Sequence, residues 1–193
     1  MALNDRRGTS DQYFEDTWAT GDDPWEHATR WYERRKYAMT VAALPRRRYA
    51  RSFEPGCGTG VLTEMLAIRS DEHLAMERHP RGAKATAARC AHLYQVRTEI
   101  GRIPHDWPLG LFDLIVLSEV LYYLDQPTIV HTLERCRRSL TTGGHLVAVH
   151  YRPEVDAHTW TGDEVHDMLR STPGWTAGTH VLDPEFVLDV LAR

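Results

Sequence analysis

The sequence predicts a three-layer α/β domain, with helices on both faces of a mostly parallel sheet. Three observations support this class. Apolar segments of strand length alternate with amphipathic helical segments along most of the chain. Residues 112–117 are almost continuously apolar, which is typical of a central parallel strand covered on both faces. A turn with three alternating glycines joins the first strand to the next helix, in the stretch Phe53-Glu54-Pro55-Gly56-Cys57-Gly58-Thr59-Gly60.

The chain before the first strand is predicted to contain a polar segment and one helix. Residues 1–22 are polar, and we expect them to be partly flexible. Apolar residues at near 3.6-residue spacing predict a helix over about 24–44, which Pro45 ends. Its other face is rich in aromatic and cationic residues. Either this helix simply packs on the sheet, or it forms a lid in which Trp31 stacks beside a ligand and Arg35 reaches a carboxylate.

The elements after the glycine turn alternate as a parallel sheet requires. Further strands are predicted at 73–77, 96–99, 112–117, 145–150, 175–181 and 185–191. Helices are predicted from Val61, from Pro80, from Asp125 and over 163–170. Thr142-Gly143-Gly144 is expected to cap the helix that begins at Asp125. The turn signal Asp183-Pro184 makes the last two strands an antiparallel hairpin, and residues 23–193 are expected to form a single domain.

Composition excludes several classes of function. The 193 residues carry a net charge of −4 with a pI near 6.2, so neither nucleic acid nor a membrane is an expected partner. The cysteines Cys57, Cys90 and Cys136 are widely separated, which argues against a disulfide framework and favours a cytoplasmic protein with reduced thiols. Eleven histidines occur without a paired metal-ligand spacing, so no metal site is predicted.

The glycine turn indicates a ligand with a polar or cationic group. Glycines allow close approach of the backbone, and the first N–H groups of the following helix point into the same space. The spacing Gly56-x-Gly58-x-Gly60 differs from the G-x-G-x-x-G of dinucleotide folds, and Glu54 would repel a phosphate. A nicotinamide-dependent oxidoreductase and a non-catalytic cofactor-binding protein nevertheless remain alternatives at this point.

Other candidate ligand contacts follow the predicted strands. Glu77 ends the second strand, roughly 20 residues past the glycines, where a carboxylate can accept both hydroxyls of a ribose. The loop around Arg102, after the third strand, is expected beside the base of a bound nucleotide, although Arg102 could instead pair with Glu99. Ser118 and Glu119 follow the fourth strand, at the edge where ligands bind in such sheets.

The glycine turn resembles motif I of the class I S-adenosylmethionine-dependent methyltransferases. A wider set of segments is similar to the nodulation protein S family, namely Asp23-Pro24-Trp25, Trp31-Tyr32-Glu33, Ala42-Ala43-Leu44-Pro45, Phe53-Glu54-Pro55-Gly56-Cys57, Leu62-Thr63-Glu64-Met65-Leu66-Ala67, Asp106-Trp107-Pro108, Phe112-Asp113-Leu114-Ile115-Val116-Leu117-Ser118-Glu119-Val120 and Leu146-Val147-Ala148-Val149-His150. The resemblance covers most of the chain from about Asp23 onward. Arg102 departs from it, because related methyltransferases often have an Asp near this place that holds the adenine amino group.

The resemblance implies a Rossmann-like class I methyltransferase fold with a seven-stranded sheet, and S-adenosylmethionine as the cofactor. It also implies transfer of a methyl group to the free amine of a glucosamine residue in a deacetylated chitooligosaccharide. The residues expected to contact the cofactor are Trp31, Arg35, Glu54, Gly56, Cys57, Gly58, Gly60, Glu77, Arg78, Gly101, Arg102, Ile103, Ser118 and Glu119.

The expected chemistry is an in-line displacement at the methyl carbon, for which an amine acceptor must arrive deprotonated. Glu119 and His150 are the candidate bases, and Tyr122 and Tyr123 the candidates for shaping the acceptor site. His150 could instead only hydrogen-bond to backbone, and Glu119 could only attract an ammonium group. Acidic residues near the mouth favour a small-molecule acceptor such as an amine or amino sugar. O-methylation of a small metabolite is the alternative within this class.

Overall fold

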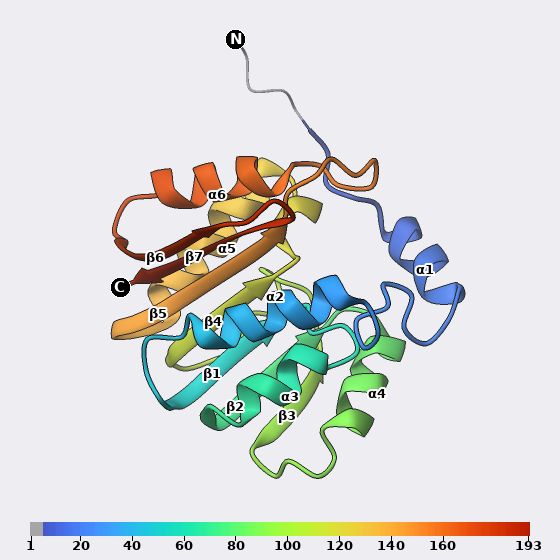
Figure 1. Cartoon of the computed structure of the whole chain (residues 1–193), viewed down its shortest axis with the longest axis horizontal. Coiled ribbons are helices and arrows are strands. Elements are labelled where there is room, and N and C mark those ends of the chain that lie inside the picture. The colour runs from blue at the N-terminus through green and yellow to red at the C-terminus, as the bar shows by residue number, and fades with distance from the viewer. Residues whose placement is uncertain (1–5) are drawn as a thin grey trace.

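The structure is a computed structural model that describes residues 6–193, so the first five residues of the predicted polar segment lie outside it. Seven strands form one sheet in the order β3-β2-β1-β4-β5-β7-β6 (Figure 1). The strands are β1 (Tyr49–Pro55), β2 (Ser70–Glu77), β3 (Val96–Ile100), β4 (Phe112–Ser118), β5 (Leu140–Tyr151), β6 (Thr176–Leu182) and β7 (Phe186–Ala192). β1 to β5 pair in parallel, whereas β7 pairs antiparallel with β5 and β6. The predicted sheet, including its C-terminal hairpin, is confirmed.

Two apolar layers hold helices against the two faces of this sheet. The helices are α1 (Asp11–Ala19), α2 (Trp31–Ala42), α3 (Val61–Ala67), α4 (Pro80–Arg89), α5 (Gln126–Ser139) and α6 (Gly162–Ser171), with a short 3₁₀ helix η1 (Leu121–Tyr123). Successive residues of β4 point to opposite faces. Leu114 packs with side chains of α2 and α3, whereas Ile115 packs with those of α5 and α6. This alternation produces the three layers.

The carboxyl ends of the parallel strands meet along one edge of the sheet. Glu54, Glu77 and Ser118 stand at the ends of β1, β2 and β4, as expected from the sequence. Because the glycine turn also begins at this edge, the polar residues that the sequence separates by about 20 or more positions are gathered in one place.

The N-terminal segment contains a helix that the sequence analysis did not predict, because residues 11–19 form α1. Ser10 caps this helix, and its side chain accepts a hydrogen bond from the Tyr13 N–H at 3.3 Å. Phe14 and Trp18 are one helical turn apart and both buried, at 8% and 2% exposed. Two apolar residues in a polar segment are only a weak indication of a helix in the sequence. They stabilise the helix because they pack against distant parts of the chain, Phe14 against Tyr123 and Trp18 against His79.

The predicted helix over 24–44 is shorter than expected. The Asp23 carboxylate accepts hydrogen bonds from the N–H groups of His27 and Ala28, each at 3.0 Å, and thereby closes a turn. Glu26 has a positive φ of 58°, which interrupts a right-handed helix. The helix α2 therefore begins at Trp31, and its buried face is polar as well as aromatic: Tyr32, Glu33, Lys36, Tyr37 and Thr40.

The predicted glycine cap at 142–144 is also wrong. The helix α5 ends at Ser139, and Leu140 already has an extended conformation at the start of β5. Gly143 and Gly144 lie within β5, in its irregular first part. The core position predicted for Cys136 is confirmed, since its side chain is fully buried.

Candidate active site

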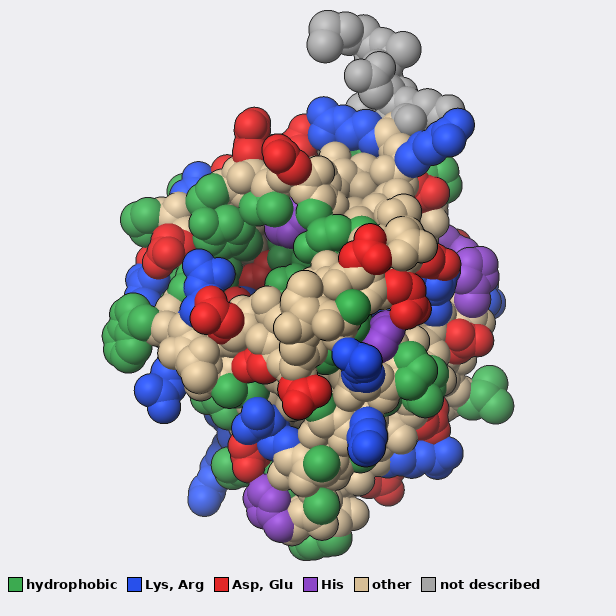
Figure 2. Space-filling view, turned by 90° about the vertical axis from the view of Figure 1, so that its right-hand side faces the viewer, with side chains coloured by type: hydrophobic (Ala, Val, Ile, Leu, Met, Phe, Trp, Pro, Cys, Tyr) green, Lys and Arg blue, Asp and Glu red, His purple; other side chains and the backbone are tan. Residues whose placement is uncertain are grey.

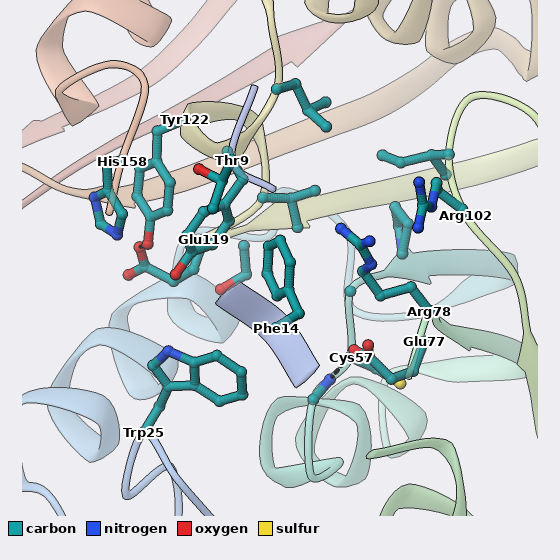
Figure 3. Close-up of a pocket in the computed structure, with 18 of the residues that line it drawn as sticks. Thr9, Phe14, Trp25, Cys57, Glu77, Arg78, Arg102, Glu119, Tyr122 and His158 are labelled. Atoms are coloured by element: carbon teal, nitrogen blue, oxygen red, sulfur yellow. Dashed lines mark hydrogen bonds between the residues drawn. The ribbon is translucent and has the colours of Figure 1, made fainter. Parts of the chain in front are cut away.

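A cavity of about 640 Å³ opens at the carboxyl ends of β1, β2 and β4 (Figure 3). This is the size range of cavities that hold a cofactor or drug-sized ligand. The predicted cofactor residues that line it are Glu54, Gly56, Cys57, Gly58, Glu77, Arg78, Gly101, Arg102, Ile103, Ser118 and Glu119. Acidic and basic side chains are interspersed on the face shown in Figure 2, so this face carries no broad basic field.

The backbone of the glycine turn is held against β2. The N–H groups of Gly56 and Cys57 both donate to the Met76 carbonyl, at 2.7 and 3.1 Å. Gly56 and Gly58 have positive φ values of 74° and 58°, which favour glycine. The turn therefore has the geometry that its sequence predicts.

The missing side chains at these glycines make room for protein rather than for a ligand. A Cβ at Gly56 would lie 2.7 Å from Val120 Cγ2, and one at Gly58 would lie 2.7 Å from His27 Cε1. Both neighbours line the cavity, so the glycines let its walls close. Gly60, expected to contact the cofactor, does not line the cavity. Its Cβ would lie 2.9 Å from Thr86 Cα, so this glycine allows close packing of two helices.

Glu77 offers a preorganised carboxylate to the cavity. Its Oε2 accepts the Gly58 N–H and its Oε1 accepts the His79 N–H, both at 3.0 Å. Burial raises the pKa of Glu77, and these backbone hydrogen bonds oppose the shift. A carboxylate oxygen accepts more than one hydrogen bond, so both oxygens can also accept from hydroxyl groups of a ligand.

Glu54 lies at the other end of the glycine turn and is also buried. Its Oε2 accepts the Thr63 hydroxyl at 2.6 Å and lies 3.2 Å from His73 Nε2. Both contacts engage Oε2, so Oε1 is available to a donor in the cavity. A carboxylate there favours an ammonium group over a phosphate.

The helix α1 covers the part of the cavity beside Glu77. Asp11 forms ion pairs with Arg78 and with Arg102, the latter at 2.9 Å. The Arg78 guanidinium lies over the Phe14 ring, 4.1 Å from its centroid, and Figure 3 shows these side chains converging. The helix α1, which the sequence analysis did not predict, thus covers this part of the cavity, while α2 lines the cavity with Tyr32, Glu33 and Tyr37. Arg102 contacts Asp11, whereas its predicted alternative partner Glu99 pairs with Arg97.

Trp31 and Arg35 lie outside the cavity, contrary to the expectation that they contact the cofactor. The Trp31 side chain is 74% exposed. Arg35 donates to Asp183 Oδ1 at 2.9 Å, in the turn between β6 and β7. The short turn before α2 sets how the helix is rotated about its axis. The face with Tyr32 and Lys36 points inward, and the side chains of Trp31 and Arg35 point away from the cavity.

Glu119 organises the opposite end of the cavity, after β4. Its carboxylate accepts hydrogen bonds from the hydroxyls of Tyr32 and Tyr122, from the Lys36 ammonium at 2.5 Å and from the Tyr151 N–H at 3.0 Å. Lys36 is fully buried and also pairs with Glu33 at 2.8 Å. Glu119 has a positive φ of 57°, which is uncommon outside glycine and marks a functional or strained position.

These contacts argue against Glu119 as a general base. Burial by itself would raise the pKa of Glu119, but the Lys36 charge and the hydrogen bonds from Lys36 and Tyr122 hold this pKa at about 2. The carboxylate is therefore ionised and fully engaged at neutral pH. Its role is to fix the surrounding hydroxyl groups.

His150, the other candidate base, does not line the cavity. Its ring is fully buried, and its Nε2 accepts the Leu121 N–H at 3.1 Å. The alternative reading from the sequence, a histidine hydrogen-bonded only to backbone, holds for Nε2, whereas Nδ1 lies 3.0 Å from His166 Nε2. His150 lies one residue before the end of β5 and points away from the cavity because side chains alternate along a strand.

His158 is a cavity residue that the sequence analysis missed. Its ring stacks on Tyr122 with centroids 3.8 Å apart and an angle of 13° between the planes (Figure 3). Burial lowers the pKa of His158 to about 4, so the ring is neutral at pH 7. It belongs to an irregular segment after β5, where no periodicity points to a role. Its only signal is that loops after parallel strands line such sites.

The other acceptor-side candidates do line the cavity. Tyr122 and Tyr123 lie on η1, directly after Glu119, with their rings 4.8 Å apart in an edge-to-face arrangement. Trp25 lies opposite them in Figure 3, on the turn before α2. The described residues contain no cluster of metal-ligating side chains and no helix long and apolar enough to cross a membrane.

Comparison with known proteins identifies relatives. Nodulation protein S of Rhizobium tropici is 34% identical over 131 residues, covering 65% of this chain and 54% of that protein. Nodulation protein S of Bradyrhizobium diazoefficiens is 34% identical over 118 residues, covering 59% of this chain and 55% of that protein. The chain thus spans about half the length of these curated relatives.

Solved structures show the same fold. A methyltransferase structure from Pseudomonas syringae, described as putative, is 36% identical with a TM-score of 0.76, and the match covers 85% of this chain and 100% of that one. The N-methyltransferase NodS from Bradyrhizobium japonicum WM9, in complex with S-adenosyl-L-homocysteine, is 26% identical with a TM-score of 0.83, and the match covers 94% and 97%. These similarities confirm the predicted class I methyltransferase fold. A sequence model of the family described as Nodulation protein S (NodS) matches residues 10–164, and the chain belongs to this family.

Proposed function

We propose that this chain is an S-adenosylmethionine-dependent methyltransferase that transfers a methyl group to a free amine of a small molecule or amino sugar. The observation that carries the proposal is the Glu119 cluster, which faces the cavity with hydrogen-bond acceptors. The relative whose structure contains S-adenosyl-L-homocysteine supports the same cofactor here.

The polar groups at the β1–β2 end of the cavity fit this cofactor. The two oxygens of Glu77 would accept the ribose hydroxyls, and Glu54 Oε1 would accept the ammonium of the amino-acid part. Gly101 and Ile103 would lie beside the base. When bound, S-adenosylmethionine supplies a methyl group on a sulfonium, which is a good leaving group.

The Glu119 end of the cavity fits an amine acceptor. The hydroxyls of Tyr32 and Tyr122 use their protons on Glu119, so each oxygen keeps lone pairs for a donor in the cavity. An amine has two N–H groups for such acceptors and a lone pair for the methyl group, whereas a hydroxyl has one O–H. This arrangement therefore favours an amine over a hydroxyl acceptor.

Charge favours the same class of acceptor. Glu33, Lys36 and Glu119 are in contact, and two carboxylates with one ammonium have a net charge of −1. His158 is neutral and adds no repulsion for a cation. Because the pKa values of Glu119 and His158 lie far from neutrality, we assign loss of the acceptor proton to water. The rate acceleration then comes from holding the amine in line with the methyl group.

The test combines binding and turnover. Titration with S-adenosyl-L-homocysteine in a calorimeter should show binding, and lack of binding would exclude the proposed cofactor. Assays with S-adenosylmethionine should then compare a chitooligosaccharide that has one free glucosamine amine with its fully acetylated counterpart, which offers only hydroxyl groups as acceptors. Methylation of the free amine alone is the expected result. Faster methylation of hydroxyls would assign the chain to O-methylation instead.

A tyrosine variant tests the acceptor end separately. Tyr122→Phe removes a buried hydroxyl that we expect to bind the amine, so kcat/KM for the amine should fall about 3- to 10-fold, while the affinity for S-adenosyl-L-homocysteine stays unchanged. Tyr94→Phe is the matched control, because Tyr94 is 96% exposed. Equal activity of the two variants would contradict the role of Tyr122.

A further inference from the structure

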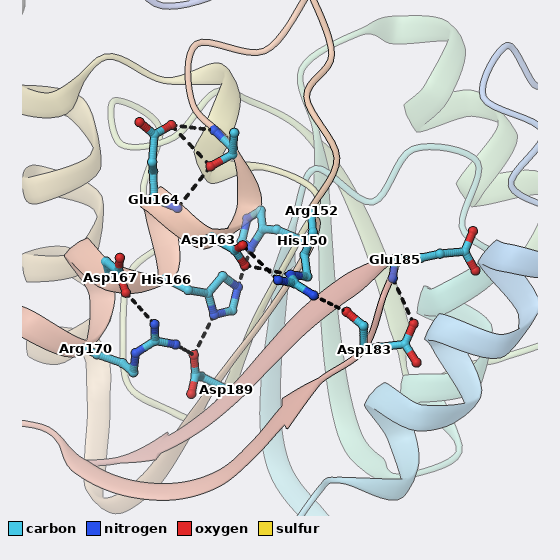
Figure 4. A network of polar contacts seen from close by, with 11 residues as sticks. His150, Arg152, Asp163, Glu164, His166, Asp167, Arg170, Asp183, Glu185 and Asp189 are labelled. Carbon is cyan, nitrogen blue, oxygen red and sulfur yellow. Dashed lines mark hydrogen bonds and ion pairs between the residues drawn. The ribbon is translucent and has the colours of Figure 1, made fainter.

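A buried chain of hydrogen bonds runs from the cavity wall to the C-terminal hairpin. The Leu121 N–H donates to His150 Nε2 at 3.1 Å, His150 Nδ1 lies 3.0 Å from His166 Nε2, and His166 Nδ1 lies 2.6 Å from Asp189 Oδ2. Figure 4 shows the two histidines between α6 and the strands, with Asp189 at the far end. Both imidazoles are fully buried, and Asp189 is 3% exposed.

The two ends of this chain determine the position of every proton in it. A backbone N–H can only donate, so His150 Nε2 must be an acceptor. An ionised carboxylate can only accept, so His166 Nδ1 must carry a proton. Both histidines are then neutral with the proton on Nδ1, and all hydrogen bonds point from Leu121 toward Asp189.

The groups around the chain support this direction. Burial opposes ionisation of Asp189, but its hydrogen bonds with His166 and His180 and the charge of Arg170 hold its pKa at about 2. Burial and the neighbouring His166 lower the pKa of His150 well below its ordinary value.

His150 is also surrounded by charged and titratable groups from other elements. Glu119 faces it from the end of β4, Lys36 from α2 and His158 from the loop after β5. The negative Glu119 favours protonation of His150, whereas the positive Lys36 opposes it. A protonated His150 would present a second donor to the Leu121 N–H, so the chain cannot accept this proton without breaking.

The chain ends at the segment that shapes the acceptor end of the cavity. Leu121 begins η1, and the next residue, Tyr122, places its hydroxyl on Glu119. The Tyr122 ring also packs edge-on against His150, with centroids 5.2 Å apart. Since η1 is only three residues long, the bond at Leu121 helps set where the Tyr122 hydroxyl lies.

We propose that His150, His166 and Asp189 are positioning residues that hold Tyr122 at the methyl-acceptor site. They do so through hydrogen bonds that are all donated in the direction from Leu121 to Asp189. None of the three lines the cavity, so they act through Leu121 and Tyr122. The effect on turnover rests on the proposed methyltransferase function, whereas the proton positions do not depend on it.

Asp189→Leu is the decisive variant, because it removes the acceptor at the end of the chain and leaves the His166 Nδ1–H without a partner. Asp189→Asn is its matched control. Arg170 donates to Oδ2 at 2.8 Å, the same oxygen that accepts the His166 Nδ1–H, so the carbonyl oxygen of an asparagine should stay at that position and keep accepting from both.

Nitrogen-15 NMR of the imidazole rings measures the tautomers without any acceptor or cofactor. The wild-type chain should show Nδ1-protonated His150 and His166, and Asp189→Asn should keep both tautomers, because its carbonyl oxygen stays on the side of Arg170 and His166. His180→Gln should also leave both tautomers unchanged, because His180 contacts the other oxygen of Asp189, at 2.8 Å. Nε2-protonated rings in the wild type would overturn the proposed direction.

Turnover tests the consequence. Asp189→Leu should lower kcat for the amine acceptor by about 10- to 100-fold, the range for small displacements at a reacting centre, and leave the affinity for S-adenosyl-L-homocysteine unchanged. Asp189→Asn should keep most of the wild-type kcat, and equal kcat in Asp189→Leu and Asp189→Asn would refute the positioning role. If the wild type shows the expected tautomers but methylates no amine, the proposed function fails while the chain itself stands.

Two variants of His150 provide a second test if Asp189→Leu does not fold. His150→Gln keeps an oxygen that can accept the Leu121 N–H, whereas His150→Leu does not. The glutamine variant should retain at least about 5-fold more of the wild-type kcat than the leucine variant. Equal losses would contradict the role assigned to the Leu121 hydrogen bond.

Discussion

Glu77→Ala should weaken the binding of S-adenosyl-L-homocysteine by about 5- to 150-fold. Glu77 is 6% exposed at the end of β2, and each of its oxygens already accepts one backbone N–H at 3.0 Å. Removing the carboxylate would leave the ribose hydroxyls of the ligand without the acceptors that this buried side chain offers. An unpaired buried group of this kind costs about 1–3 kcal/mol, which corresponds to the stated loss of affinity.

The assay is a calorimetric titration with a matched control and a second ligand. Glu72→Ala removes a carboxylate from the same strand, where the side chain is 74% exposed, and should bind as the wild type does. The analogue of S-adenosyl-L-homocysteine that lacks the ribose 2′-hydroxyl should lose less affinity than the parent ligand when Glu77 is replaced, because one hydrogen bond is already missing.

Two results would refute this reasoning. A change of less than about twofold in Glu77→Ala would show that the carboxylate does not bind the ligand. Equal losses of affinity for the parent and the 2′-deoxy ligand would show that Glu77 does not interact with that hydroxyl. Because Glu77 also accepts the Gly58 N–H, a thermal melt must first show that Glu77→Ala is still folded.

Three further predictions concern stability. Gly58→Ala should destabilise the chain by more than about 1 kcal/mol, because φ is +58° and the added Cβ would lie 2.7 Å from the His27 ring. As the control, Gly21→Ala has nothing within 4 Å of its added Cβ and should change stability by less than about 0.5 kcal/mol. Equal urea midpoints of the two variants would contradict this prediction. Trp18→Ala should cost about 3–5 kcal/mol and Trp31→Ala less than about 0.5 kcal/mol, since the two side chains are 2% and 74% exposed, and urea unfolding that ranks them otherwise would refute the assignment of α1 to the core. Because the pKa of His158 is lowered from 6.5 to about 4, the unfolded chain binds more protons than the folded chain between these pH values, and the free energy of unfolding should decrease as pH falls through this range. His158→Gln should flatten the plot of this free energy against pH in the same range. An unchanged slope would contradict the lowered pKa.

The sequence by itself determined the sheet and the cofactor end of the cavity. Alternating and near-continuous apolar patterns are local consequences of burial, so β4 and the C-terminal hairpin could be placed from the sequence alone. Glu54 and Glu77 were found because a parallel sheet brings the carboxyl ends of its strands to one edge whatever packs around it. The function of the glycines was only partly foreseen, since the space at Gly56 and Gly58 is taken by Val120 and His27.

Only the tertiary structure decided which side chains face the end of the cavity beside Glu119. Glu119 follows β4 and His150 lies near the end of β5, and in the sequence both look equally suited to act as a base. In the structure, Lys36 and two tyrosines hydrogen-bond to Glu119, whereas His150 points into the interior. No periodicity or motif in the sequence points to His158. A one-residue shift along a strand, or a turn such as the one before α2, reverses the direction in which a side chain points. The packing of distant segments decides which of these arrangements the chain adopts.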